Sequence, residues 1–264
     1  MGAPGSTDPL IEARSVSIRF ATDAGVTTAV EDVSLHVRTG EKFVLLGPSG
    51  CGKSTFLKSV AGFVRPSAGQ ILFKGLEVSE PGADRILIFQ EFDQLLPWKT
   101  VLGNVVFGLQ TAARLSPQQV RSRAMAHLEM VGLKGFKDAF PHTLSGGMKQ
   151  RVALARSLAL NPEVLLMDEP FGSLDALTRL RMQAELNRIW QETHKTILFV
   201  THSIQEAVLI GHRIMVMTPR PGRVLAMLDN PGVDSGSDSP AFLRTQKEIR
   251  GLLGVENGDA LHGD

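Results

Sequence analysis

The sequence is short of several features, and each shortage excludes a class of protein. Cys51 is the only cysteine among 264 residues, so no disulfide can form within the chain and a reducing compartment is permitted. No stretch approaches the ~20 apolar residues that a membrane-spanning helix needs, and the opening MGAPGSTDP lacks the charged-then-apolar order of a signal peptide. Lys and Arg number 28 against 27 for Asp and Glu, so the basic excess of nucleic-acid binders is missing. We therefore expect a protein that is soluble or docks peripherally and has no nucleic-acid partner.

Internal repeats and sustained heptads are also missing, which leaves solenoids and coiled coils without support. Partial alternation of apolar and polar residues at Ile11–Phe20 and Val26–Val37 predicts an antiparallel flap. Five short apolar runs are typical of buried parallel strands, and they are Phe43–Leu46, Ile86–Phe89, Val164–Met167, Ile197–Val200 and Ile214–Met217. The pattern predicts an α/β core.

A helical insert is predicted at about residues 95–160, where the periodicity is helical and no strand pattern appears. Ser116 can cap a helix there, with Pro117 in the first helical position and Gln119 closing a capping box. The residues that then share one face, followed by a glycine suited to the helix end, are Val120, Ala124, Leu128, Val131 and Gly132.

The C-terminal part is expected to be an appendage to the main domain. After a strand expected at Arg223–Leu228, the run PGVDSGSDSP is typical of a linker, and Phe242–Leu253 is a weakly amphipathic helix. The last ten residues are expected to fray. The predicted main domain covers residues 8–230, and residues 231–264 form the linker, the short helix and the tail.

The most informative stretch is GPSGCGKST, which directly follows the apolar run Phe43–Leu46. Its glycines let backbone N–H groups approach a polyphosphate, and the next helix offers its positive N-terminus. Lys53 can reach the β- and γ-phosphates, and Ser54 can ligate Mg²⁺. The predicted nucleotide cradle, a P-loop, consists of Gly47, Pro48, Ser49, Gly50, Cys51, Gly52, Lys53, Ser54 and Thr55.

Two adjacent carboxylates, Asp168 and Glu169, follow the apolar run Val164–Met167. Ligands bind at the carboxyl ends of strands in such sheets, and alternating side chains point in different directions. Asp168 would hold Mg²⁺ directly or through water, and Glu169 would be the general base that polarises the attacking water. Taken alone, Asp-Glu-Pro after a strand is more often a helix N-terminal cap.

A second anion-binding helix start is predicted at Leu144–Arg151, which has the sequence LSGGMKQR. A serine and two glycines before a helix leave backbone N–H groups uncovered by side chains. One chain with one ATP has no use for two phosphate sites of this kind.

Together these motifs resemble the nucleotide-binding subunit of an ABC transporter, over about Ile11–Leu228. Further matching features are Gln90, Gly172–Asp175 and the run ILFVTH that ends at His202. The resemblance implies an α/β P-loop NTPase with a RecA-like parallel core sheet, an antiparallel β flap and an all-helical subdomain that carries the LSGGMKQR signature. It also implies an ATPase with ATP and Mg²⁺ as cofactors.

In this family two copies close head to tail, and each ATP lies between one copy's P-loop and the other copy's signature segment. By that resemblance His202 would clamp the γ-phosphate, and Gln90 would sense Mg²⁺ and the attacking water. The second copy would supply Ser145, Gly146, Gly147 and Asp175. The catalytic set would then be Glu169, His202 and Gln90, and the metal set Ser54, Gln90 and Asp168.

The chain departs from the family pattern at two positions. Phe20 stands where the family usually has a tyrosine that stacks on adenine, and this chain has no tyrosine. Phe20 can still stack through its π-face, although a core phenylalanine on a strand is the alternative. Met148 stands where the commonest signature has glutamine, and we expect little effect because serine and the glycine backbone contact the phosphate.

Cys51 is most simply a small residue that fits the loop, although alkylation of its thiol is predicted to block nucleotide binding.

A surface for membrane subunits is predicted at Glu91–Trp98, which could line a groove for a short cytoplasmic helix; ordinary packing of the helical insert is the alternative. The patterns PGADRILIFQEFDQLLPW and MTPRPGR resemble the importer branch that handles nitrate, sulfonates, taurine and related solutes. This resemblance implies a homodimer on the cytoplasmic face of the membrane, integral permease partners and, indirectly, an extracytoplasmic solute-binding protein.

Two rival functions remain open. A soluble ABC-type ATPase acting on nucleic acid or ribosomes would usually show tandem cassettes, zinc cysteines, long coiled-coil inserts or a basic tail, and none is present here. A P-loop kinase would need an acceptor site and has no reason for LSGGMKQR. The sequence does not identify the transported solute or the permease.

Overall fold

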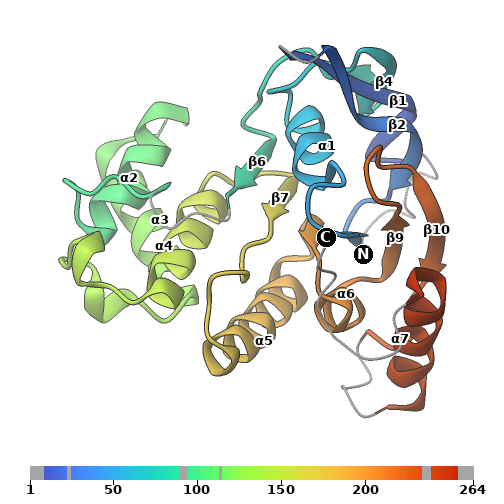
Figure 1. The fold of residues 1–264 in the computed structure, drawn as a ribbon. Helices are drawn as coiled ribbons and strands as arrows, with labels where there is room; N and C mark the ends of the chain where they lie inside the picture. The colour runs from blue at the N-terminus through green and yellow to red at the C-terminus, as the bar shows by residue number, and fades with distance from the viewer. Residues whose placement is uncertain (1–8, 23–24, 90–93, 113–114, 234–238, 255–264) are drawn as a thin grey trace, which may run out of the picture. The chain divides into compact units, whose positions relative to one another are not determined.

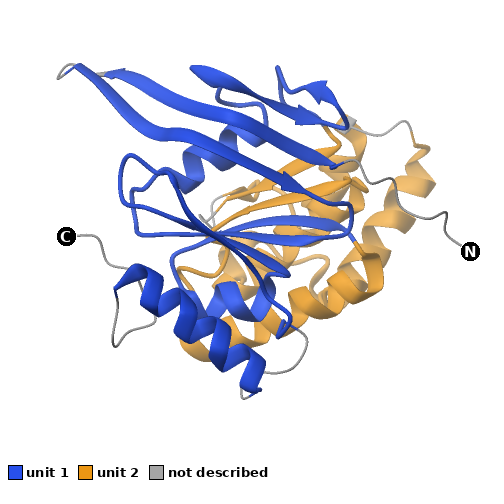
Figure 2. Ribbon diagram, turned by 90° about the vertical axis from the view of Figure 1, so that its right-hand side faces the viewer, with its two compact units in different colours: residues 1–82, 195–264 blue, residues 83–194 orange. Residues whose placement is uncertain are grey.

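A computed structural model describes residues 9–22, 25–89, 94–112, 115–233 and 239–254. The chain divides into two compact units, one of residues 1–82 with 195–264 and the other of residues 83–194 (Figure 2). Within the described ranges, none of the helices combines the length and the apolar character that crossing a membrane requires.

The first unit contains the expected antiparallel flap, a sheet of strand order β2-β1-β4-β5 (Figure 1). Its strands are β1 (Ile11–Thr22), β2 (Gly25–Val37), β4 (Ala68–Phe73) and β5 (Leu76–Glu77). The inward side chains of β2 alternate with exposed ones, as the sequence pattern indicated. The sequence analysis did not identify β4 and β5, whose apolar run Ile71–Phe73 is too short to stand out.

The second sheet of this unit has β3 (Lys42–Leu46) between β8 (Thr196–Thr201) and β9 (Arg213–Met217), parallel to both. Every residue of these three strands is buried, which explains their nearly continuous apolar sequences. β10 (Val224–Asp229) pairs antiparallel with β9 at the edge.

The described part of the first unit also contains three helices. α1 (Lys53–Val60) packs near β8, and α6 (Ile204–Ile210) packs on β3 and β8. α7 (Pro240–Leu253) covers the approximate range expected for the C-terminal helix and packs on α6, with Phe242 and Ile249 buried. The C-terminal helix is thus part of a compact unit, whereas the expected tail lies outside the described residues.

The second unit contains a parallel strand pair and the predicted helical region. The pair is β6 (Arg85–Ile88) with β7 (Val164–Asp168). The helices are α2 (Val101–Ala112), α3 (Pro117–Met130), α4 (Gly146–Ala159) and α5 (Ala176–Thr193), with 3₁₀ turns at Lys134–Phe136 and Pro141–Thr143. α2, α3 and α4 pack against one another, and α4 also contacts β6 and α5 (Figure 1).

The predicted start and end of α3 are confirmed. The Ser116 hydroxyl accepts from the Gln119 N–H at 3.3 Å, and the Ser116 N–H donates to the Gln119 side chain at 2.9 Å. The face expected to be apolar is buried, and Gly132 has a φ of +69° just after the helix. Local sequence signals therefore place the start and the end of this helix.

Replacing Ser116 with alanine should lower the free energy of unfolding by about 1 kcal/mol, because the Gln119 N–H in the first turn of α3 loses its hydrogen-bond acceptor. Urea unfolding followed by circular dichroism measures the change. The control is Ser122→Ala, an exposed position inside the same helix, which should be neutral or slightly stabilising. Equal stabilities of the Ser116 and Ser122 variants would show that the capping box does not stabilise the unit.

Candidate functional site

The loop between β3 and α1 has the geometry that its glycines require. Gly50 and Gly52 have φ angles of +76° and +103°, which L side chains rarely adopt. A Cβ on Gly52 would also lie 2.5 Å from the carbonyl oxygen of Ala29. Substituting Gly52 is therefore excluded by backbone strain and by contact with a neighbouring strand.

Lys53 is enclosed by its own loop. Its side chain is 3% exposed, and Nζ donates to the carbonyl oxygens of Gly47 at 2.8 Å and of Pro48 at 2.9 Å. α1 has no acidic residue in its first turn, and Gly52 at its N-cap supplies no side chain to its N–H groups. An ammonium group and a helix N-terminus thus lie together, a combination suited to phosphate.

The remaining loop residues differ in exposure. Ser49 and Gly50 are exposed, and Ser54 and Thr55 are half-buried in the first turn of α1. The Cys51 side chain is 0% exposed, which favours its interpretation as a small residue that fits the loop. A thiol reagent would reach it only when the loop opens, so the expected block of nucleotide binding by alkylation would be slow.

Sequence reasoning missed the segments that support this loop from outside. The Arg220 Nε donates to the Gly50 carbonyl at 3.2 Å, and the Gly222 N–H donates to the Ala29 carbonyl at 3.0 Å. A Cβ on Gly222 would overlap the Cys51 carbonyl oxygen. The only signal was MTPRPGR, which the sequence analysis used for a family resemblance and not for its contacts.

His202 leaves the same sheet edge as the loop. Leu46 pairs with Thr201 in the parallel register of β3 and β8, so Gly47 and His202 are the next residues on adjacent strands. The Thr201 hydroxyl donates to the buried Glu206 carboxylate at 2.6 Å and accepts from the Ser203 N–H at 3.0 Å. These hydrogen bonds hold both residues that flank His202.

Phe20 lies near the end of β1, where it pairs with Thr27. Its side chain is 42% exposed, which argues against the alternative of a core phenylalanine. An exposed aromatic face at this position can stack on a planar ligand.

In the second unit, Asp168 ends β7 and is 8% exposed. Glu169 follows with a φ of +43°, a left-handed conformation that costs a non-glycine residue about 1–3 kcal/mol. The next helix, α5, begins only at Ala176, so the alternative that Asp168 and Glu169 cap a helix is wrong. Such strain is concentrated at functional sites, where it directs a side chain.

Asp175 caps α5. Its carboxylate accepts from the Thr178 N–H at 3.0 Å. Hydrogen bonds from the backbone and the side chain of Thr178 lower the pKa of this carboxyl group, so it is ionised at neutral pH. The sequence analysis assigned Asp175 to an interface and did not anticipate this local role.

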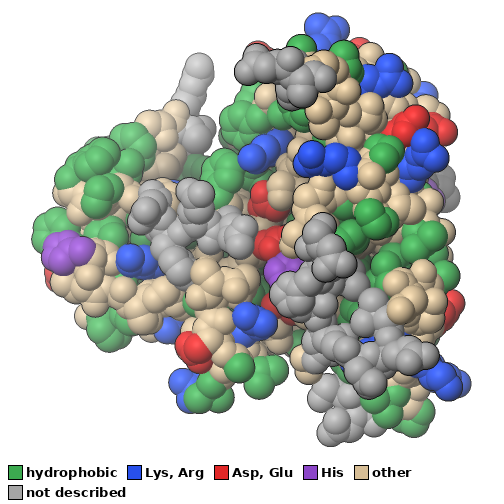
Figure 3. Space-filling model, viewed as in Figure 1, with side chains coloured by type: hydrophobic (Ala, Val, Ile, Leu, Met, Phe, Trp, Pro, Cys, Tyr) green, Lys and Arg blue, Asp and Glu red, His purple; other side chains and the backbone are tan. Residues whose placement is uncertain are grey.

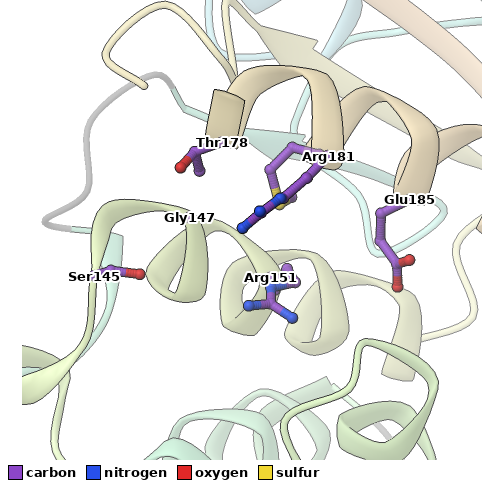
Figure 4. Close-up of a pocket in the computed structure, with 7 residues that line it drawn as sticks. Ser145, Gly147, Arg151, Thr178, Arg181 and Glu185 are labelled. Carbon is purple, nitrogen blue, oxygen red and sulfur yellow. The ribbon is translucent and has the colours of Figure 1, made fainter. Parts of the chain in front are cut away.

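The signature segment starts α4. The exposed Ser145 is the N-cap, and its hydroxyl accepts from the Met148 N–H at 3.3 Å. A Cβ on Gly147 would lie 2.7 Å from the Thr178 Cγ2, so the first turns of α4 and α5 are in contact. A pocket of about 370 Å³ opens beside them, called here the α4–α5 pocket (Figure 4). It is lined by Ser145, Gly147, Arg151, Thr178, Arg181, Met182 and Glu185.

The structure thus brings the predicted residues together in two groups. The first unit contains the P-loop and His202 at one sheet edge, with Phe20 on its flap. The second unit contains Asp168 and Glu169 after β7, and the signature segment beside Asp175. Gln90 lies outside the described residues. Within the described ranges there is no group of three or more His, Cys, Asp or Glu side chains suited to a metal ion.

The family model described as "ABC transporter" matches residues 30–172, from β2 past β7. The chain belongs to the ABC transporter family. The predicted recognition and the ATPase class are therefore confirmed, and so is the α/β fold with its antiparallel flap and helical subdomain.

Relatives and solved structures agree with this assignment. The taurine import ATP-binding protein TauB of Rhizobium johnstonii is 46% identical over 92% of this chain and 96% of its own length. An uncharacterized ABC transporter ATP-binding protein of Methanocaldococcus jannaschii, MJ0412, is 46% identical over 89% of this chain and 87% of its own. The dimeric structure of MJ0796, a bacterial ABC transporter cassette, has a TM-score of 0.74 at 32% identity, over 83% of this chain and 98% of that one. A second structure of MJ0796 is a post-hydrolysis dimer bound to ADP and Pi, with a TM-score of 0.73 at 31% identity over the same shares of the two chains.

Replacing Gly147 with alanine should lower the free energy of unfolding by about 1–3 kcal/mol, because the new methyl group overlaps Thr178. Adding Thr178→Ser removes the opposing Cγ2 and keeps the hydroxyl, so the double variant should regain most of the loss. Urea unfolding of the single and double variants measures the coupling.

The matched control for this pair is Gly135→Ala in a 3₁₀ turn of the same unit, where an added Cβ meets open space. Its stability should stay near that of the wild type. If the double variant is no more stable than Gly147→Ala alone, the contact between the two helix starts does not limit this position.

Proposed function

We propose that this chain is the ATP-hydrolysing subunit of an importer for taurine or a related small sulfonate or nitrate-type solute. The observation that supports it most is the pairing, in one chain, of a P-loop that encloses Lys53 with a second exposed anion-binding helix start at Ser145. Relatives with the printed function of taurine import span more than nine-tenths of the chain, which supports the choice of solute class.

The P-loop would bind the ATP phosphates. Lys53 would donate to the β- and γ-phosphate oxygens in place of its present loop carbonyls, and the N–H groups of the loop would surround them. The hydroxyl of Ser54 and the carboxylate of Asp168 are hard oxygen donors of the kind that Mg²⁺ prefers. When bound, Mg²⁺ would neutralise charge on the transferring phosphate. Phe20 would stack on adenine.

Glu169 would orient and polarise the attacking water. Its left-handed backbone turns its side chain away from the direction that a regular strand would give it. His202 would donate to the γ-phosphate, and the hydrogen bonds around Glu206 hold its neighbours in place. Gln90 is proposed to sense the metal and the water.

A second copy of the chain would complete each site. The dimeric cassettes among the structural neighbours support this arrangement. Ser145, Gly146 and Gly147 would contact the γ-phosphate bound by the partner, and Asp175 would cross the interface. ATP binding would close the dimer and hydrolysis would reopen it, so that docked membrane helices move with the cycle.

The permease would dock on the helical region, on the cytoplasmic side of the membrane. Residues 91–93 lie outside the described part of the chain, but Trp98 is 71% exposed while Leu95 is buried. The buried Asn104 side chain donates to the carbonyls of Leu96, Lys99 and Thr100, which holds this segment in place. The segment is therefore divided between the two alternatives, with Leu95 in the core and Trp98 available to a partner. A solute-binding protein would deliver the solute to the permease.

A soluble cassette that acts on nucleic acid has less support. On the face shown in Figure 3, the described Lys and Arg side chains are interspersed with Asp and Glu side chains. Electrostatic attachment to a polyanion requires clustered positive charge instead.

Replacing Glu169 with glutamine should slow ATP hydrolysis by about 10²-fold or more, because the general base is lost. ATP should then trap a dimer that elutes early on gel filtration. Adding Lys53→Ala to the Glu169 variant should abolish this dimer, because ATP no longer binds. The control Glu129→Gln, on the exposed face of α3, should hydrolyse ATP normally. Hydrolysis at the wild-type rate by the Glu169 variant would remove this residue from its proposed role.

Deleting the encoding gene should abolish uptake of the transported solute by intact cells. Radiolabelled taurine, an alkanesulfonate and nitrate are compared, and we expect the loss to fall on taurine. The wild-type gene should restore uptake, whereas Lys53→Ala should not. Unchanged uptake of all three solutes in the deletion strain would contradict the proposed importer function.

A further inference from the structure

The α4–α5 pocket extends beyond the residues to which the function above gives a role. Ser145 and Gly147 form its rim, and Arg151, Arg181, Met182 and Glu185 form the rest of its wall together with Thr178. Its volume of about 370 Å³ lies within the range of small-molecule sites. Figure 4 shows the Arg181 side chain reaching from α5 toward α4, close to Gly147.

The charges of the wall leave the pocket positive. Among the described residues that line the pocket, the one carboxylate is that of Glu185, and it accepts from Arg188 at 2.8 Å and 3.2 Å, so a cation outside the pocket offsets its charge. Arg151 donates to a neutral group, the Val131 carbonyl, at 3.3 Å. Arg181 is exposed, and it makes no hydrogen bond or ion pair with the part of the chain that the structure describes. Two guanidinium groups thus face the pocket without a carboxylate of their own.

The rim adds donors of the same kind. The Ser145 hydroxyl is exposed at the start of α4, a helix of 14 residues with no acidic residue in its first turn. Its positive end therefore adds to the field of the two arginines. Guanidinium groups match the oxygens of phosphate with two parallel hydrogen bonds, which distinguishes them from lysine.

We propose that Arg181 and Arg151 make the α4–α5 pocket a binding site for a phosphate group. Its two sources are the inorganic phosphate released by hydrolysis and the terminal phosphate of a nucleotide. The inference deepens the proposed function and rests on it, because the proposed trans contact places the γ-phosphate at Ser145 and Gly147. A released phosphate then has a positive pocket directly beside it, and Arg181 holds it there before it leaves.

Calorimetric titration of the nucleotide-free full chain with inorganic phosphate tests this assignment. The Lys53→Ala background removes phosphate binding by the P-loop. Arg181→Gln should weaken binding about tenfold, because one charge-assisted pair of hydrogen bonds is lost. Arg181→Lys keeps the charge and should weaken it less. Arg121→Gln is the matched control, an exposed arginine on α3 outside the pocket, and should bind like its parent.

A parallel titration with ADP in the same background separates the two sources. Arg181-dependent binding of inorganic phosphate identifies the free ion, whereas Arg181-dependent binding of ADP alone identifies the nucleotide. Equal affinities of the Arg181→Gln variant and its parent, or no saturable binding of either probe by the parent, would overturn the proposal. Circular dichroism of each variant confirms that the fold is retained.

The two proposals fail separately. If ATP traps the Glu169→Gln dimer but the affinity for phosphate does not depend on Arg181, only the pocket assignment is wrong. If phosphate binding depends on Arg181 but ATP never traps a dimer, the pocket is a phosphate site and the proposed trans contact is wrong.

Discussion

The enclosure of the Lys53 ammonium by its own loop is the constraint on which the rest of the first unit depends. A charged group at 3% exposure needs several polar partners. The carbonyls of Gly47 and Pro48 can serve as partners because the loop curls around the side chain. That curl requires the left-handed backbone of Gly50 and Gly52. It also requires support from outside, because Ala29, Arg220 and Gly222 touch the loop from segments far apart in the sequence. The flap and the edge of the second sheet therefore act as parts of the phosphate cradle.

The second unit depends on a closer fit, between two helix starts. Gly147 and Thr178 leave no room for one methyl group, and Thr178 also donates to Asp175. The signature segment therefore contacts the first turn of α5, which Asp175 caps. Since both segments are proposed to face a second copy of the chain, this contact would make them respond to ATP together. The α4–α5 pocket lies on the same two helices, so a phosphate bound there would bias the same contact.

Three residues have structural roles that the sequence analysis did not identify. Asp175 caps α5 and is also expected at the interface. Glu206 is buried in the first unit, where it fixes Thr201 beside His202. Arg220 belonged to a pattern that indicated only a family branch, although its side chain supports the P-loop. Glu206 and Arg220 each bind a residue of another element, 5 and 170 positions away, so no helix or strand pattern reveals them, whereas the Asp175 cap joins residues three positions apart and is a local pattern that the sequence analysis did not use.

The sequence by itself determined the elements whose signals are local. The P-loop motif, the capping box at Ser116 and the buried runs of β3, β7, β8 and β9 follow from residue spacing, because helix starts, turns and buried strands each require particular residues close together. Only the tertiary structure decided that Phe20 is exposed, that Cys51 is buried, that Asp168 and Glu169 do not cap a helix, and that Arg151 and Arg181 share a pocket. These outcomes depend on which side chains meet across elements, and such contacts follow from packing of the whole unit and not from the order of neighbouring residues.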